Sequence, residues 1–459
     1  MTRAATTTLR RTPRLAALAM LAALLAAGCG DTAQLQLRDG IGAQPQLPPP
    51  KKTLLPTVHV AEATGWPAGA APTTAPGTTV VRFAEGLDHP RWLHVLPNGD
   101  VLVAETNAPP RPQEGQGLKG WVMQQVMKRA GAGTPSANRI TLLRDADGDG
   151  VAEQRSVFAE GLNSPFGMAL VGSSFYVANA DALVRYAYTE GAQQLQGPPQ
   201  KVADLPGGPR NHHWTKSLIA SPDGSKLYAG VGSNSNVAEN GMAEEDRRAT
   251  ILEIDTRTGA QRVFASGLRN PVGMAWEPTG RTLWVAVNER DEIGSDLVPD
   301  YMTSVRDGGF YGWPYSYFGQ HVDERVQPPR PDLVQQAIVP DYALGPHTAS
   351  LGLAWSGGNQ LPPAFSSGMF VGQHGSWNRK PRSGYRVIFV PFTAGKPAGE
   401  PIEVLTGFVN GQGEAQGRPV GVAIDARGGL LVADDVGNIV WRVTGSAAPQ
   451  STAPGTVSR

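Results

Sequence analysis

Three basic side chains each stand a few residues before a short apolar segment of this chain, which has 459 residues and only eight histidines. They are His213, Arg269 and Arg418. Converging arginines suit a polyanionic ligand, because a guanidinium pairs with a carboxylate through two hydrogen bonds. A neighbouring histidine could act as a general base, because its unperturbed pKa lies near neutral pH. The same residues could instead be structural, with His213 bonded across a channel and Arg269 in an ion pair.

The elements that must position these residues form an internal repeat. Each unit has an apolar strand, a turn rich in Gly or Asn, and a second apolar strand; the six turns lie at 97–99, 171–173, 222–224, 278–280, 357–359 and 427–429. Six copies with room for four strands each predict an all-β fold, a six-bladed β-propeller. Loops that enter the inner strands of a propeller gather at one mouth of its channel, so the basic residues are expected to meet there.

An acidic stretch forms a separate motif. Asp145, Asp147 and Asp149 alternate and are followed by a glycine at the sixth position, which resembles the start of a calcium loop. The glutamate expected at the twelfth position is absent, but Glu153 could substitute for it. The stretch therefore predicts either a structural calcium site or a solvated acidic turn, and neither reading is catalytic.

The N-terminus has the features of an export signal. A basic region precedes an apolar run over Leu15–Ala27, which is too short to span a membrane, and Cys29 is the only cysteine. The junction resembles a bacterial lipobox, with residues 1–28 as a lipoprotein signal peptide and Cys29 as the lipidation site. We therefore expect a protein exported to the cell envelope and lipid-anchored on the periplasmic side. An ordinary secretory signal is the alternative.

Composition sets the remaining boundaries. Residues 29–77 are rich in Pro, Ala and Thr, which predicts a flexible tether, and residues 446–459 predict a disordered tail. The propeller domain is then expected over 78–445. Lys plus Arg and Asp plus Glu both number 40, which argues against a nucleic-acid partner and leaves the lipid anchor as the only expected membrane contact.

Several segments of the folded part follow one another as they do in a known family. The segments are 211–218, 268–275, 308–314, 372–379 and 417–423. In this order they resemble the soluble sugar dehydrogenases that depend on pyrroloquinoline quinone (PQQ). The last two segments are similar to the sorbosone dehydrogenase-like branch of that family. The resemblance extends over residues 80–445.

This resemblance implies roles for individual residues. His213 would take the proton of a substrate hydroxyl while hydride passes to PQQ. The backbone carbonyls of Glu289 and Arg290 would hold a catalytic calcium, although the loop 288–291 is shorter than in the glucose-oxidising relatives. The residues implied to contact the cofactor are Arg269, Asn270, Arg379 and Arg418.

The predicted function is therefore a PQQ- and calcium-dependent oxidoreductase acting on a small-molecule sugar, either an aldose or a sorbosone-like sugar aldehyde. No Cys-x-x-Cys-His motif occurs, so electrons are expected to pass to a separate acceptor. Two alternatives stay open. One is a metal-dependent lactonase that would use Glu105, Asn179, Asn288 and Asp434; the other is a non-catalytic lipoprotein that serves as a binding scaffold.

Overall fold

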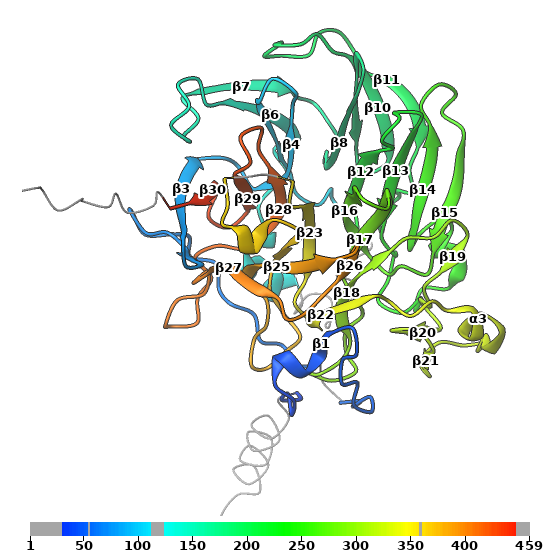
Figure 1. Ribbon diagram of the computed structural model, residues 1–459. Helices are drawn as coiled ribbons and strands as arrows, with labels where there is room; N and C mark the ends of the chain where they lie inside the picture. The colour runs from blue at the N-terminus through cyan, green and yellow to red at the C-terminus, as the bar shows by residue number, and fades with distance from the viewer. Residues whose placement is uncertain (1–29, 54–55, 112–123, 358–359, 447–459) are drawn as a thin grey trace, which may run out of the picture.

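Six sheets, each built on four antiparallel strands, surround a central axis in the computed structural model, which describes residues 30–53, 56–111, 124–357 and 360–446 (Figure 1). Blade 1 consists of β4 (Pro90–Val95), β5 (Val101–Glu105), β6 (Arg139–Arg144) and β7 (Gln154–Ala159). Blade 2 consists of β8 (Gly167–Val171), β9 (Ser174–Ala178), β10 (Ala182–Ala187) and β11 (Gln200–Asp204). Blade 3 consists of β12 (Lys216–Ala220), β13 (Lys226–Val231), β14 (Thr250–Asp255) and β15 (Gln261–Ser266).

The remaining blades carry additions. Blade 4 consists of β16 (Pro271–Glu277), β17 (Thr282–Val287), β18 (Pro299–Ser304) and β22 (Tyr342–Pro346). Blade 5 consists of β23 (Ser350–Trp355), β24 (Gly368–Gln373), β25 (Arg386–Thr393) and β27 (Ile402–Thr406), with β26 (Lys396–Pro397) paired to β25. An insertion between β18 and β22 contains β19 (Gly309–Phe310), β20 (Ser316–Tyr317), β21 (His321–Val322) and α3 (Pro331–Gln336), and β19 pairs with β15.

Blade 6 closes the ring with strands from both ends of the folded part. It consists of β28 (Pro419–Ile424), β29 (Leu430–Asp434), β30 (Ile439–Gly445) and β3 (Thr78–Ala84). β3 pairs with β30 along its length, from Thr78 opposite Gly445 to Ala84 opposite Val440. The predicted six-bladed propeller is therefore confirmed.

The inner strands of neighbouring blades approach closely. A Cβ on Gly273 in β16 would lie 2.5 Å from the backbone nitrogen of Leu353 in β23, so only glycine fits there. At the mouth, the rings of Trp92, Phe166 and Trp214 connect blades 1 to 3, with centroids 4.6 and 5.8 Å apart. Such aromatic pairs contribute about 0.5–1.5 kcal/mol each beyond the area they bury. These contacts fix the inner strand ends, which carry the candidate site.

The segment preceding the propeller packs against it. Within it, η1 (Leu37–Gly40) and β1 (Ile41–Gly42) lie beside β22, and β2 (Thr73–Thr74) pairs with β27 (Figure 1). Asp31 is buried and accepts a hydrogen bond from the Ser295 nitrogen at 2.9 Å. The prediction of a flexible tether over 29–77 is therefore wrong for its described residues, because their backbone groups find partners on the propeller loops.

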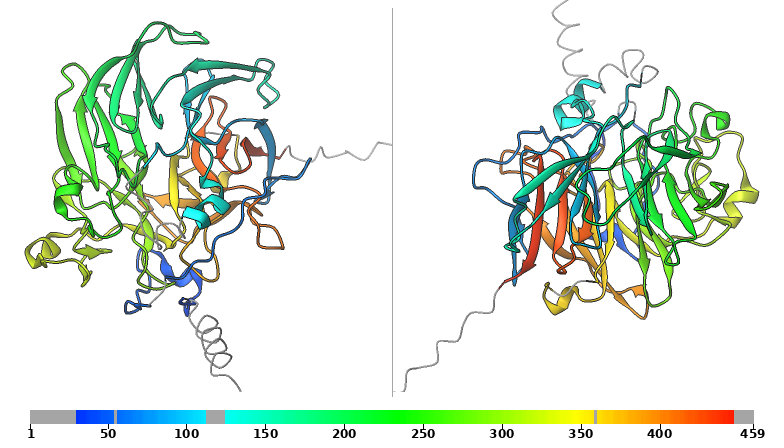
Figure 2. Two further views of the ribbon diagram at one scale, coloured as in Figure 1. Left: turned by 180° about the vertical axis from the view of Figure 1, so that it is seen from behind. Right: turned by 90° about the horizontal axis from the view of Figure 1, so that it is seen from above.

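Some predictions concern residues that lie outside the described ones. These are the signal peptide over 1–28, the lipidation site Cys29 and all but the first residue of the tail. A helical turn at 124–132 includes η2 (Lys128–Ala132) and lies on one face of the propeller, as the cyan segment in Figure 2 shows. No helix among the described residues combines the length and apolar character needed to cross a membrane.

Candidate active site

A cavity of 1350 Å³ lies at the mouth where the predicted loops gather. Residues before the inner strands β8, β12 and β16 contribute Ser164, His213 and Arg269 to its wall. Loops that follow β5, β13 and β17 contribute further residues, among them Asn107, Asn236 and Asn288, and the turn at 124–132 also lines it. Pockets for drug-sized ligands measure roughly 300–1,000 Å³, so this one has room for a cofactor and a substrate together.

His213 is held in one orientation by the residue that follows β13. Its Nδ1 lies 2.8 Å from the carbonyl oxygen of Ser233 and 3.0 Å from that residue's hydroxyl. A carbonyl can only accept, so Nδ1 carries the proton and donates it. The Ser233 hydroxyl in turn donates to the carbonyl of Ser235 at 2.6 Å. Nε2 therefore keeps its lone pair and accepts no hydrogen bond from the part of the chain that the structure describes.

The electrostatic environment of His213 favours its neutral form. Burial lowers the pKa of this imidazole well below its usual value, and the positive charges of Arg269 and His212 lower it further. A neutral imidazole with a free Nε2 beside a cavity is the form that a general base requires.

The loop that carries His213 is fixed by two neighbours. The buried ammonium of Lys216 donates to the carbonyl of Trp214 at 3.0 Å and lies 3.4 Å from that of His213. A Cβ on Gly232 would collide with the Cβ of His213 and with the side-chain oxygen of Asn270. Glycine at this position therefore allows the two segments that carry His213 and Asn270 to lie against each other.

Arg269 is brought beside His213 because β12 and β16 are inner strands of adjacent blades. It is 2 % exposed, and its guanidinium donates to the carbonyl of Glu289 at 2.7 Å and to that of Asn288 at 3.3 Å. It also donates to the side-chain oxygen of Asn236 at 3.0 Å. Asn270, also predicted to contact a cofactor, is buried, and its Oδ1 has no hydrogen-bond partner.

The loop 288–291 does not fit the predicted calcium site. The carbonyl of Glu289 is occupied by Arg269, which carries a positive charge. The side chain of Arg290 is fully buried and donates to the carbonyls of Pro314 at 2.9 Å and Ser316 at 2.7 Å, in the insertion. Two guanidinium groups thus flank the backbone that was expected to bind a cation, and the assignment of Glu289 and Arg290 as metal ligands is not supported.

Arg379 and Arg418 do not line the cavity. Arg379 donates to the carbonyl of Pro381 at 2.8 Å and lies 3.7 Å from Asp296. Arg418 donates to the carbonyl of Ala61 at 3.3 Å and to the Tyr385 hydroxyl at 3.1 Å. Both are buried, and Nε of each has no hydrogen-bond partner among the described residues, so their contact with a cofactor stays a prediction.

The physical cause of this difference is the N-terminal segment. Residues 57–61 run along the loop 377–382, with bonds from the Asn378 amide to the Thr57 carbonyl at 2.6 Å and from the His59 nitrogen to the Trp377 carbonyl at 2.8 Å. Arg382 donates to the carbonyl of Val60 at 2.8 Å. We call residues 56–66 the strap. It accepts a hydrogen bond from Arg418 and lies against the loop that carries Arg379.

Other cations stand in the cavity wall instead. Among the described lining residues, five are Lys or Arg and three are Asp or Glu, and the basic ones are Arg91, Arg111, Lys128, Arg210 and Arg269. Arg91 is bound by the buried carboxylate of Asp435 at 2.6 Å, which also lies 2.9 Å from His374. Arg91 stands directly before an apolar run, as Arg269 does, so the same sequence signal could have identified it. Arg210 has no comparable motif.

The cavity suits the cofactor that the sequence motifs imply. PQQ is a planar tricarboxylate, and the excess of basic side chains favours such an anion. Trp214 and Trp377 add aromatic surface to the wall. Arg210 lines the cavity as well, and its Nε has no hydrogen-bond partner among the described residues, although it lies 4.0 Å from the carboxylate of Glu244. The described residues therefore fit PQQ, with Arg269, Arg91 and Arg210 as the groups that would hold its carboxylates.

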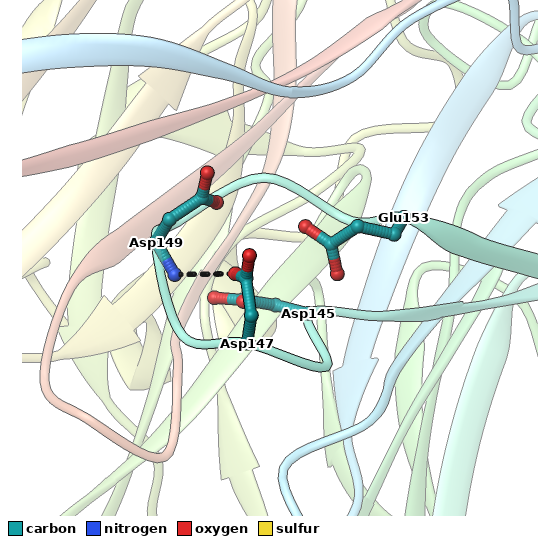
Figure 3. A group of neighbouring side chains, drawn as sticks. All are labelled: Asp145, Asp147, Asp149 and Glu153. Atoms are coloured by element: carbon teal, nitrogen blue, oxygen red, sulfur yellow. Dashed lines mark hydrogen bonds between the residues drawn. The ribbon is translucent and has the colours of Figure 1, made fainter.

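The acidic stretch forms a cluster away from the cavity, in the hairpin between β6 and β7. Ligand oxygens of Asp145, Asp147, Asp149 and Glu153 all lie within 4.8 Å of one another (Figure 3). Within the cluster, the Asp149 nitrogen donates to Asp147 at 3.1 Å, and Asp145 pairs with Arg427 at 3.0 Å. The predicted convergence of the three aspartates is present, with Glu153 as the fourth carboxylate.

The two carboxylates of the lactonase alternative are bonded to other side chains. Glu105 accepts two hydrogen bonds from Arg139, at 2.9 and 2.7 Å, and Asp434 accepts from the indoles of Trp66 and Trp441. In the described part of the chain, the acidic hairpin is the one group of three or more His, Cys, Asp or Glu that is close enough to share a metal. The geometry thus gives no support to a lactonase centre in the channel.

Comparison with known proteins finds relatives of this chain by sequence similarity. Residues 333–446 match the family model described as TrAA12-like. An uncharacterized protein of Borreliella burgdorferi is 25% identical over 305 residues, which cover 64% of this chain and 79% of that protein. A PQQ-dependent pyranose dehydrogenase of Coprinopsis cinerea is 27% identical over 222 residues, covering 39% of this chain. The match spans only 30% of that dehydrogenase.

Solved structures show the same fold over most of the chain. The holo PQQ domain of pyranose dehydrogenase from Coprinopsis cinerea superposes with a TM-score of 0.65 at 21% identity, covering 84% of this chain and 100% of that domain. A calcium structure of a Trichoderma reesei carbohydrate-active enzyme of family AA12 gives 0.66 at 17% identity, covering 84% and 98%. The PQQ-bound aldose sugar dehydrogenase of Streptomyces coelicolor gives 0.52 at 18% identity, covering 82% and 100%.

These similarities place the propeller among folds that carry PQQ in other proteins. A further family model, described as "Domain of unknown function (DUF7133)", matches residues 87–375, which is more than half of the chain. That span contains the segments that carry His213 and Arg269. The chain therefore belongs to the DUF7133 family and has the fold of the PQQ-binding sugar dehydrogenases.

Proposed function

We propose that this protein is a PQQ-dependent oxidoreductase that oxidises an aldose or a sorbosone-like sugar aldehyde. One observation carries the proposal. His213 donates from Nδ1 to Ser233 and keeps Nε2 free beside a cavity that also contains Arg269. The site thus pairs a neutral base with a fixed positive charge. The base can take a proton from the substrate, and the positive charge stabilises an anionic cofactor beside it.

When bound, PQQ supplies a quinone that accepts two electrons. The chain's own residues provide binding, orientation and proton transfer. Nε2 of His213 would take the proton of the hydroxyl on the carbon that is oxidised, which for an aldehyde is a hydroxyl of its hydrate. The hydride of that carbon carries the two electrons that the quinone would accept. The Ser233 carbonyl stabilises the resulting imidazolium through Nδ1.

The basic wall has a second role in this proposal. Arg269, Arg91 and Arg210 would pair with carboxylates and so fix the plane of the cofactor relative to His213. Asparagine side chains supply neutral donors and acceptors for sugar hydroxyls, and those in the wall include Asn107, Asn163, Asn236 and Asn240.

The names of the relatives support the class of substrate. A pyranose dehydrogenase and an aldose sugar dehydrogenase are among the proteins that this chain resembles. The sorbosone-like specificity, export to the periplasmic side of the envelope, lipidation at Cys29 and transfer of electrons to a separate acceptor are proposed from the sequence motifs alone.

The test is reconstitution of the purified protein with PQQ. We expect PQQ to bind with a change in its absorbance spectrum and a sugar panel that includes aldoses and sorbosone to reduce an artificial electron acceptor. His213→Ala should lower kcat/KM by about 10²–10⁴-fold, the usual contribution of a general base, while PQQ still binds. His94→Ala is the matched control, because His94 is a partly buried histidine of β4 that does not line the cavity.

Two outcomes would contradict the proposal. Failure of PQQ to bind would leave a binding scaffold as the better interpretation of the propeller. Turnover that is equally fast in His213→Ala would show that another group takes the proton.

A further inference from the structure

The backbone of the loop 288–291 is wrapped around a guanidinium group. Arg269 donates to the carbonyl oxygens of Glu289 at 2.7 Å, Asn288 at 3.3 Å and Asn236 at 3.3 Å. These oxygens point at one buried positive charge, and backbone carbonyls are also among the oxygens that calcium binds in proteins. The loop thus has the donor chemistry of a cation site, and the cation that it holds belongs to the chain itself.

The carboxylates around the loop are also engaged. Asp300 accepts from the Glu289 nitrogen at 2.8 Å, the Ser350 nitrogen at 2.7 Å and the Thr348 hydroxyl at 3.0 Å. Both carboxylate oxygens of Asp300 thus accept hydrogen bonds from the folded chain, so Asp300 does not offer a free oxygen to a metal.

The other two carboxylates have cationic partners. Glu289 lies 3.0 Å from the guanidinium of Arg290. Asp291 lies 2.9 Å from His347 and 3.6 Å from Arg269. Calcium needs six to eight oxygen ligands, and here the carbonyl oxygens of Asn288, Glu289 and Asp291 already have donors. A divalent ion would also have to enter between two buried guanidinium groups, which repel it.

We propose that the guanidinium of Arg269 is the resident cation of the loop 288–291, in the position where a calcium ion was expected, and that the cavity binds its anionic cofactor without calcium. The first part stands on the contacts of this chain alone. The second part rests on the proposed function, because it concerns PQQ. Arg269 would thereby hold the loop in shape and present its positive charge to the cavity at the same time.

Direct calcium binding tests the first part. The acidic hairpin must be removed first, because it could bind calcium independently, so the reference protein is the double variant Asp147→Asn, Asp149→Asn. We expect equilibrium dialysis with radioactive calcium at millimolar concentration to find no stoichiometric ion in this reference. Its thermal unfolding temperature should be the same in calcium and in a chelator. One tightly bound calcium, or a rise of several degrees, would overturn the proposal.

Removal of the guanidinium gives a second, independent readout. Arg269→Met in the reference background leaves the carbonyls of 288 and 289 without their donor, so calcium should now bind and raise the unfolding temperature. Arg248→Met is the matched control, because Arg248 is another buried arginine, bonded to the carbonyls of Pro206, Gly207 and Gly232. Calcium that rescues both variants equally, or neither, would contradict a cation position at Arg269. If Arg269→Met does not fold, the reference protein still decides the question.

The cofactor tests the second part. Titration of the reference protein with PQQ should give the same dissociation constant in calcium and in chelator, within about twofold, whereas a calcium-dependent cofactor site would lose affinity by orders of magnitude. A loss of affinity in chelator would overturn the proposal. No PQQ binding in either condition would refute the proposed function, while the dialysis result would still stand for or against Arg269.

Discussion

Two sides of the same propeller mouth use their arginines differently. On the side of blades 3 and 4, Arg269 faces the cavity beside His213. On the side of blades 5 and 6, Arg418 donates to the strap and to the Tyr385 hydroxyl, and Arg379 donates to a carbonyl of its own loop, beside which the strap runs. Arg418 precedes an inner strand as Arg269 does, so both stand at the same topological level. The comparison shows that the strand order brings a residue to the mouth of the propeller. Whether that residue faces the cavity depends on the strap, which is added to the propeller.

The largest effect is expected when one arginine is removed from each side of the mouth, which tests whether the two sides differ in cofactor binding. Arg269→Met should weaken PQQ binding by at least about 100-fold, because a buried charge that pairs with a carboxylate is lost. Arg418→Met should change PQQ affinity by less than about threefold, since that guanidinium bonds to the strap instead. Absorbance titration of both variants measures the difference. Equal losses of affinity would mean that Arg418 reaches the cofactor after all.

A smaller effect is expected from loosening the strap. Trp66 packs edge-on against Phe408 and Trp441, with centroids 5.5 and 5.4 Å apart, and donates to Asp434 at 2.7 Å. Trp66→Ala should lower the free energy of unfolding by about 2–4 kcal/mol, from lost packing and a lost hydrogen bond to a buried carboxyl group. Denaturant unfolding measures this change.

The Trp66→Ala variant also tests directly whether the strap limits access to the arginines of blades 5 and 6. Phenylglyoxal labels accessible arginines, and mass spectrometry locates the labelled peptides. We expect Arg379 and Arg418 to be labelled faster in Trp66→Ala than in the unmodified protein. Trp355→Ala is the control, because Trp355 packs on Phe392 in blade 5 and belongs to a different hydrophobic cluster from Trp66. Unchanged protection in Trp66→Ala would show that the strap is not what covers these arginines.

The smallest predicted effect is a shift in pH dependence on the cavity side. A base must be neutral to act, and burial, Arg269 and His212 all lower the pKa of His213. Turnover should therefore persist as the pH falls through the usual histidine range and decline only at lower pH. His212→Gln removes one of the causes, so the pKa of His213 rises and the acid limb of kcat/KM moves to higher pH.

A control at a histidine that does not line the cavity separates this effect from general damage. His374 is bonded to Asp435 and is not among the groups that shift the pKa of His213. His374→Gln should leave the acid limb in place even if it alters the maximal rate. An acid limb that moves downward in His212→Gln, or that moves equally in both variants, would contradict the electrostatic account of His213.

Much of the fold was predictable because its signals are local. The turn at 97–99 falls between β4 and β5, and that at 222–224 falls between β12 and β13, as the repeat predicted. A period of four strands per unit specifies a propeller, and strand order then places His213 and Arg269 in adjacent blades. The candidate base and its neighbouring cation therefore follow from the sequence.

The tertiary structure alone decided which other side chains complete the site. A composition rich in Pro and Ala predicts a segment that builds no core of its own, yet residues 30–77 find partners on loops that are distant in sequence. The bond from Ser295 to Asp31 spans 264 residues, and that from Arg418 to Ala61 spans 357. The sequence also could not predict that Arg269 donates to the carbonyls of the loop 288–291, because the directions of carbonyl groups depend on the folded backbone. Local periodicity thus determined the propeller and its mouth, and long-range backbone contacts decided which charges the mouth presents.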